Sequence, residues 1–169
     1  MVETVVTVER TTTTQTAAPA SGGGLSALKI NIGYFQTYPG AIKLVQFFLG
    51  IICLACGSPA LLAATSFFLF VVVVAFIATL LWIFAYLLGI REALNLAVNW
   101  IFTELLNTGI VTILYFIASV VQLAKWTAYF NSYGYGANIA AGVFGLFNFL
   151  AYAAGTYFLY LEHKSGATI

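Results

Sequence analysis

Long runs without charge make up most of this chain. Asp, Glu, Lys and Arg are absent from residues 44–90, 105–124 and 126–161. A helix that crosses a bilayer needs about 20 consecutive apolar residues, so the first run is long enough for two such helices and each of the others for one. We therefore predict four membrane-spanning helices, at about residues 40–57, 60–88, 100–124 and 137–161.

The longest apolar run is interrupted by Gly57, Ser58 and Pro59. Proline is tolerated in the first turn of a helix, where its missing N–H has no helical partner. We therefore expect Pro59 to lie in the first turn of the second helix. The turn at residues 57–59 then joins the first two helices into a tight antiparallel hairpin.

Small and polar residues recur at alternating spacings of three and four along each predicted helix. A period of 3.5 residues marks a left-handed packing face, and small or polar residues on it favour helix contacts in lipid. The second helix has the weakest pattern. In all four helices, Phe, Leu, Ile and Val are expected to face lipid. The residues on these faces are Lys43, Gln46, Gly50, Cys53 and Gly57; Ala75, Thr79, Trp82, Tyr86 and Gly89; Glu104, Thr108, Val111, Tyr115, Ala118, Gln122 and Lys125; and Asn138, Ala141, Gly145, Asn148, Tyr152, Gly155 and Leu159.

Five polar residues on these faces are candidates for a buried polar site: Lys43, Glu104, Thr108, Gln122 and Asn148. Ionisable residues inside a membrane are candidate functional sites. An ion pair between Lys43 and Glu104 would be structural, as would a bond from Glu104 to Asn107, Thr108 or a backbone amide. The alternative is a small channel or proton-coupled transporter that uses Glu104. Transporters commonly have broken helices around a midplane site, and no proline or acid interrupts these helices near their middle. The structural interpretation is therefore preferred.

The fourth helix carries a set of small residues: Ala141, Gly142, Gly145, Ala151 and Gly155. Small residues let helix backbones approach closely in lipid. They serve either to pack the helix within the bundle or to form a face for a partner protein, and the sequence leaves both open.

Cys53 and Cys56 form a C-x-x-C motif, which raises a third alternative, a membrane thiol oxidoreductase. A redox motif of this kind favours a helix N-terminus. These cysteines fall at the C-terminal end of the first predicted helix, in apolar surroundings. We therefore expect them to pack as small hydrophobic residues.

Composition limits the remaining possibilities. The chain is 62% hydrophobic and only 7% charged, with a mean hydropathy of +1.01, whereas soluble domains are roughly 25% charged. A net charge of +1 gives no basic surface for nucleic acid. With one His and no Asp, we expect no metal site, no bound cofactor and no catalytic residues. The pattern predicts an all-α integral membrane protein, a left-handed bundle of four helices with a disordered N-terminal tail.

The ends and loops complete the predicted organisation. Residues 1–37, rich in Thr and Gly, are expected to be disordered, residues 38–163 to form the membrane domain and residues 164–169 a short C-terminal tail. Residues 89–101 have an amphipathic pattern typical of a segment at the membrane surface. Positive residues predominate on the side of the termini, which places both termini in the cytoplasm. Tyr and Trp near the span ends, among them Trp126, are expected to form interfacial belts.

The stretch "NWIFTELLNTGIVTILYFIASVVQLA", residues 99–124, resembles the third helix of the MARVEL domain. The likeness lies in Trp100 followed four residues later by Glu104, and in the block "LYFIASV" from Leu114 to Val120. The stretches "YPGAIKLVQFFLGIICLAC" and "NIAAGVFGLFNFLAYAAGTYFLY" are similar to the first and fourth helices of the chemokine-like-factor-like branch. That branch is related to the myelin-and-lymphocyte protein and plasmolipin, and the resemblance covers about residues 38–163.

The resemblance implies a non-enzymatic role. MARVEL proteins act in vesicle trafficking and membrane apposition, organise cholesterol-rich microdomains, and chaperone other membrane proteins. It implies a multi-pass protein of the plasma membrane or of secretory or endosomal vesicles. The expected partners are the lipid bilayer, cholesterol, another membrane protein bound through helix faces, and a second copy of the chain.

Overall fold

The computed structural model describes residues 32–90 and 99–166, and within them every regular element is helical. Four long helices are apolar enough to cross a membrane, which confirms the predicted all-α membrane fold. Their bounds, with those of two short 3₁₀ helices, are η1 (Ile32–Gln36), α1 (Tyr38–Gly57), α2 (Ala63–Leu87), α4 (Trp100–Trp126), η2 (Thr127–Tyr129) and α5 (Tyr135–Gly166).

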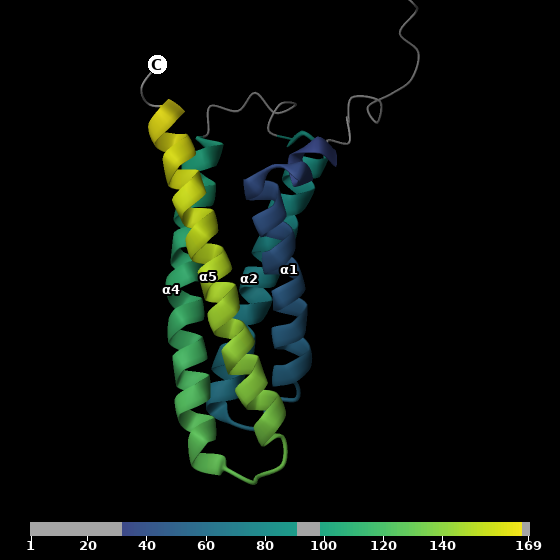
Figure 1. The fold of residues 1–169 in the computed structure, drawn as a ribbon, viewed down its shortest axis with the longest axis vertical. Helices are drawn as coiled ribbons and strands as arrows, with labels where there is room; N and C mark the ends of the chain where they lie inside the picture. Colours follow the sequence, from purple (N-terminus) through teal and green to yellow (C-terminus); the bar gives the residue numbers. More distant parts are fainter. Residues whose placement is uncertain (1–31, 91–98, 167–169) are drawn as a thin grey trace, which may run out of the picture.

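The four helices form an antiparallel bundle (Figure 1). Helix α1 packs against α2 and α5, and α4 also packs against α2 and α5. Consequently α1 and α4 lie diagonally opposite each other, as do α2 and α5. Both η1 and the C-terminal end of α5 lie at one end of the bundle, called here the terminal end (Figure 1). The connections from α1 to α2 and from α4 to α5 lie at the other, called the loop end.

Local sequence accounts for two helix starts at the terminal end. The Thr37 hydroxyl accepts a hydrogen bond from the amide of Gly40, 3.4 Å away, and Pro39 occupies the first turn of α1. The Asn99 side chain similarly accepts from the amide of Phe102 at 3.2 Å and caps α4. Each cap satisfies an amide that has no partner within its helix.

The hairpin between α1 and α2 differs from the prediction. Helix α2 begins at Ala63, so Pro59 lies in a loop at residues 58–62 and not in the first turn of the helix. Ser58, which precedes this proline, is extended with φ −94° and ψ 140°, as the residue before a proline favours. The chain therefore leaves the axis of α1 at Ser58 and needs the following residues to turn back.

The prediction that residues 32–37 belong to a disordered tail is wrong. They include the 3₁₀ helix η1, and the Tyr34 ring stacks on Tyr86 of α2 with ring centroids 4.2 Å apart and planes 5° apart. The aromatic residues here supply the apolar surface that the preceding Thr-rich sequence lacks. Gly40 allows the approach, because a Cβ atom there would lie 2.9 Å from the Cα of Phe35.

At the other end of the chain, α5 continues to Gly166. Residues 164–166 are therefore helical, although a tail was expected from residue 164. The described part of the chain leaves out residues 1–31, 91–98 and 167–169. These include most of the expected tail and most of the expected amphipathic segment.

The buried positions of α1 and α5 coincide with the faces expected from the 3.5-residue period. The agreement is partial in α2, where Ala75 and Thr79 are buried as expected, and it ends before the last turn of α4. In α4 the predicted position Lys125 is exposed and its neighbour Trp126 is buried. Trp82 and Tyr86 of α2, and Gly89 just beyond its end, are only half-buried. The buried residues of α2 are Thr65, Phe68, Val71, Val72, Ala75 and Thr79. With a mean hydropathy of 3.0, α2 has too little polar contrast for the buried face to stand out in its sequence.

We expect Gly145→Val to destabilise the bundle by about 1–3 kcal/mol, the usual cost of overpacking. A Cβ atom at Gly145 would lie 2.8 Å from Cε2 of Phe68 and would also collide with the Ser119 hydroxyl. The measurement is unfolding in detergent micelles by titration with SDS. Gly136→Val, on the same helix, is the control because a Cβ there meets nothing within 4 Å. Equal stability of the two variants would contradict close packing at Gly145.

Candidate functional site

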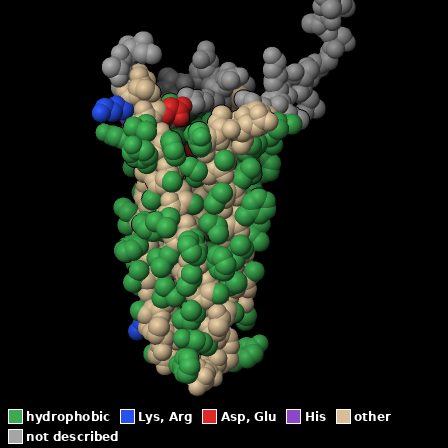
Figure 2. Space-filling model, viewed as in Figure 1, with side chains coloured by type: hydrophobic (Ala, Val, Ile, Leu, Met, Phe, Trp, Pro, Cys, Tyr) green, Lys and Arg blue, Asp and Glu red, His purple; other side chains and the backbone are tan. Residues whose placement is uncertain are grey.

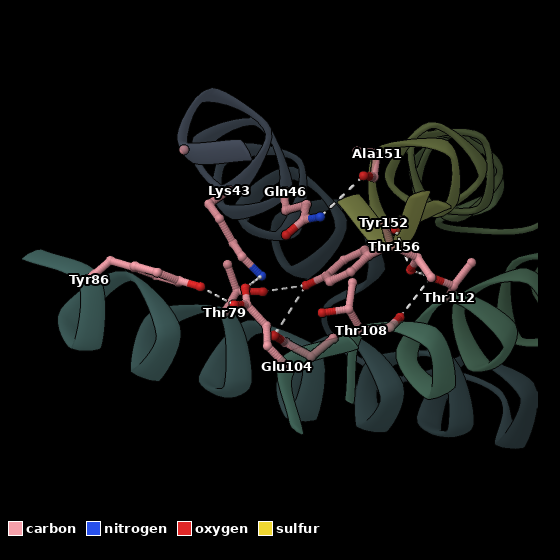
Figure 3. A network of polar contacts seen from close by, with 12 residues as sticks. Lys43, Gln46, Thr79, Tyr86, Glu104, Thr108, Thr112, Ala151, Tyr152 and Thr156 are labelled. Carbon is pink, nitrogen blue, oxygen red and sulfur yellow. Dashed lines mark hydrogen bonds and ion pairs between the residues drawn. The ribbon is translucent and has the colours of Figure 1, made fainter. Parts of the chain in front are cut away.

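A carboxylate inside the bundle joins three helices near the terminal end (Figure 3). Nζ of Lys43 in α1 lies 2.8 Å from Oε1 of Glu104 in α4, and the side chains are 5% and 0% exposed. The Tyr86 hydroxyl of α2 donates a hydrogen bond to the second carboxylate oxygen, Oε2. The negative charge of Glu104 is therefore both neutralised and hydrogen-bonded, as a buried charge requires.

The next polar contact toward the loop end crosses the other diagonal of the bundle. The Tyr152 hydroxyl of α5 lies 3.2 Å from the carbonyl oxygen of Ala75, to which it donates, and 2.6 Å from the hydroxyl of Thr79. Since the single proton of Tyr152 is used on Ala75, Thr79 donates to Tyr152. These two bonds attach α5 to α2.

Two buried amides connect α1, α4 and α5 in the middle of the bundle. Nε2 of Gln46 donates to the carbonyl of Ala151 at 3.2 Å (Figure 3). Nδ2 of Asn148 donates to the Tyr115 hydroxyl at 2.9 Å and lies 3.4 Å from the carbonyl of Gln46. Gly155 leaves the space for Gln46, because a Cβ atom there would lie 2.9 Å from Nε2.

Thr108 lies beside these amides and is also buried. Its carbonyl accepts a hydrogen bond from the Thr112 hydroxyl at 2.7 Å, and Thr112 lies 3.1 Å from the hydroxyl of Thr156 in α5. Thr108 therefore takes part through its backbone, and the neighbouring threonines supply the hydroxyl contact between α4 and α5.

A separate polar cluster closes the loop end. Nε2 of Gln122 donates to Oδ1 of Asn138 at 2.9 Å, and the Thr65 hydroxyl lies 3.4 Å from the same oxygen. The Trp126 indole donates to the Thr65 hydroxyl at 2.8 Å. Trp126 is 2% exposed, so its assignment to an interfacial belt is wrong. Its hydrogen bond to α2 explains the burial, and no sequence pattern pointed to Thr65.

The small residues of α5 face other helices of the bundle. The nearest atoms to a Cβ at Gly142 would belong to Leu123, and those at Gly145 to Ser119 and Phe68. Ala141 is buried, and Ala151 is half-buried with its carbonyl bonded to Gln46. This placement gives the four buried residues a packing role in the interior, and only Ala151 keeps some exposed surface.

Both cysteines have free thiols. Cys53 is buried, with Sγ 3.9 Å from the carbonyl of Ala141, and Cys56 is half-buried. No group of three or more His, Cys, Asp or Glu side chains able to hold a metal ion occurs in residues 32–90 and 99–166. The polar side chains that the bundle encloses bond mainly to other helices, and their geometry fixes the positions of the helices.

The family model of the MARVEL domain, described as a membrane-associating domain, matches residues 34–158. The chain belongs to the MARVEL family. The match begins within η1, so this MARVEL domain includes the segment that stacks on Tyr86. No solved structure matches the chain. The assignment to the chemokine-like-factor-like branch stays a prediction.

Removing one partner of the buried ion pair should destabilise the MARVEL bundle strongly. We expect Glu104→Gln or Lys43→Met to cost about 3–5 kcal/mol, because each leaves a charge buried without its partner. The double variant should recover part of this loss. Lys125→Met, which removes an exposed lysine, is the control. SDS titration in micelles measures all four proteins, and single variants as stable as the control would show that the pair contributes nothing.

Trp126→Phe tests the loop-end cluster. The change removes the indole N–H and leaves the buried Thr65 hydroxyl without its donor, so we expect a loss of about 1–3 kcal/mol. Tyr133→Phe, at an exposed aromatic residue of the loop before α5, should have no effect. Unfolding of the two variants in the same micelles provides the comparison. A Trp126→Phe protein as stable as Tyr133→Phe would argue against a structural role for the indole.

Proposed function

We propose that this MARVEL protein is a non-enzymatic tetraspan adaptor. It acts in vesicle trafficking, in membrane apposition and microdomain organisation, or as a chaperone for a membrane-protein partner. The observation that carries the proposal is the division between interior and surface. The enclosed polar groups mainly connect the helices, whereas the outer sides of the helices are covered by apolar side chains along the bundle (Figure 2).

The short connections at the loop end support recognition within the membrane. Residues 58–62 join α1 to α2, and residues 130–134 follow η2 before α5. Loops of this length offer little surface outside the bilayer. Contacts with lipid, cholesterol or a partner's transmembrane helix therefore occur on the outer sides of the helices.

The contacts of Glu104 favour the adaptor over a transporter. A proton relay needs a carboxylate that gains and loses a proton in turn. The Glu104 carboxylate is fully buried, and its two oxygens are engaged by the Lys43 ammonium and the Tyr86 hydroxyl, so no free carboxylate oxygen faces a path through the bundle. The buried Cys53 likewise has no exposed approach for a redox partner.

The distribution of lysines supports the proposed orientation. Lys43 and Lys164 lie toward the terminal end of the bundle, and Lys125 lies near the loop end. The positive-inside rule then places the terminal end in the cytoplasm. The proposed location is the plasma membrane or secretory or endosomal vesicles.

The adaptor proposal predicts a bound membrane-protein partner and no transport. We expect capture of the full chain from native membranes in mild detergent to retain one membrane protein at near-stoichiometric yield, and lipid analysis of the same eluate tests for cholesterol enrichment. An unrelated four-span protein captured in parallel is the control. In liposomes, the purified chain and Glu104→Gln should both leave a proton gradient intact. Gradient loss with the wild-type chain would favour the transporter.

A further inference from the structure

A groove of about 300 Å³ lies between α2 and α4, on a side of the bundle away from α5. Small, apolar and aromatic residues form most of it, and the rings of Trp82 and Trp100 meet edge to face with centroids 6.4 Å apart. Its lining residues are Ala78, Leu81, Trp82, Ala85, Trp100, Thr103 and Asn107.

Two lining residues of this groove, Trp100 and Asn107, carry polar groups without a hydrogen-bond partner in the described residues. Asn107 is the one with both donors and an acceptor. Its side chain is half-buried, and its carboxamide forms no hydrogen bond within residues 32–90 and 99–166. Asn107 lies within the charge-free run 105–124. It follows Glu104 by three residues, which is about 4.5 Å along the helix axis. This position belongs to the third predicted membrane-spanning helix.

An unpaired carboxamide at this depth is energetically costly. Polar side chains in transmembrane helices almost always face a bundle interior or pair with one another. The buried carboxamides of Gln46, Gln122 and Asn148 follow this rule, since each donates a hydrogen bond to another helix. The Asn107 carboxamide lines the groove, so a partner outside the bundle can reach it.

We propose that the groove between α2 and α4 is the interface at which two copies of this chain dimerise, with the Asn107 carboxamides of the two copies hydrogen-bonded to each other. Copies in one membrane share their orientation. A twofold axis along the membrane normal therefore brings Asn107 of both copies to the same depth. A carboxamide has donors and an acceptor, so two of them bond reciprocally without any other polar group.

The shape of the groove fits this arrangement. Ala78 and Ala85 leave room for close approach of a second helix. Leu81, which lines the groove, is 65% exposed and projects beyond it. In a twofold dimer the Leu81 side chain of each copy enters the groove of the other. By contrast, exposed positions in the middle of α1, such as Val45, Phe48 and Ile51, present only apolar side chains.

Dimerisation is measured by energy transfer between donor- and acceptor-labelled full chains in phosphatidylcholine liposomes, over a range of protein-to-lipid ratios. We expect Asn107→Leu to weaken dimerisation about 3- to 30-fold, the range typical of losing a polar contact between helices in lipid. Asn107→Gln, which keeps the carboxamide, should retain most of the association. Ala78→Phe should also weaken it by filling the groove. Leu150→Ala, at an exposed position on α5, should leave it unchanged.

Two results would overturn the proposal. In the first, the wild-type chain shows no more energy transfer than chance proximity produces, or Asn107→Leu shows as much transfer as the wild type. Either observation would mean that lipid occupies the groove. Loss of transfer with Asn107→Leu but not with Ala78→Phe would place the contact outside the groove. Unfolding in SDS serves as the folding control. Since Asn107 has no bonding partner within the described part of the chain, Asn107→Leu should keep wild-type stability.

Discussion

The Glu104 carboxylate is the contact on which the arrangement of this bundle most depends. In lipid the hydrophobic effect does not drive helices together, because lipid tails are as apolar as the side chains they surround. Helices associate through close packing and through polar contacts. Glu104 receives Lys43 from the diagonally opposite helix and Tyr86 from a neighbour, and Tyr86 in turn stacks on Tyr34. One buried charge thereby links α1, α2, α4 and η1.

The same principle operates along the rest of the bundle. Helix α2 is the most apolar of the four. Its hydroxyl side chains bond to other helices or, for Ser66, to the nearby backbone carbonyl of Leu62. Thr79 reaches Tyr152 across the second diagonal, and Thr65 meets both Trp126 and Asn138. A helix without pattern in its sequence is thus positioned by individual hydrogen bonds at its ends and middle. Glycines on α5 provide the close approach that these short side chains need.

Sequence periodicity could predict which face of a helix is buried, but it could not predict partners. The faces of α1 and α5 were visible because small and polar residues alternate there with large apolar ones. On α2, Phe68 and Val72 look like the lipid-facing residues beside them, so nothing marked them as buried. Trp126 resembles an interfacial tryptophan until the Thr65 hydroxyl is placed next to it. The segment at Tyr34 was missed because its order depends on Tyr86, which is distant in the sequence.

The separation of interior from surface has a consequence for association. Residues such as Lys43, Glu104 and Asn148 determine whether the bundle forms, and they have no surface to offer a partner. Outward residues can change with little effect on the bundle, since lipid replaces whatever contact they lose. Selectivity for a partner in the membrane then has to come from features that lipid cannot imitate. A half-buried carboxamide is such a feature, because a hydrocarbon chain offers it no hydrogen bond. Asn107 has this property in the groove between α2 and α4, and for this reason the groove, and not the larger apolar surface around it, is the surface most suited to specific recognition.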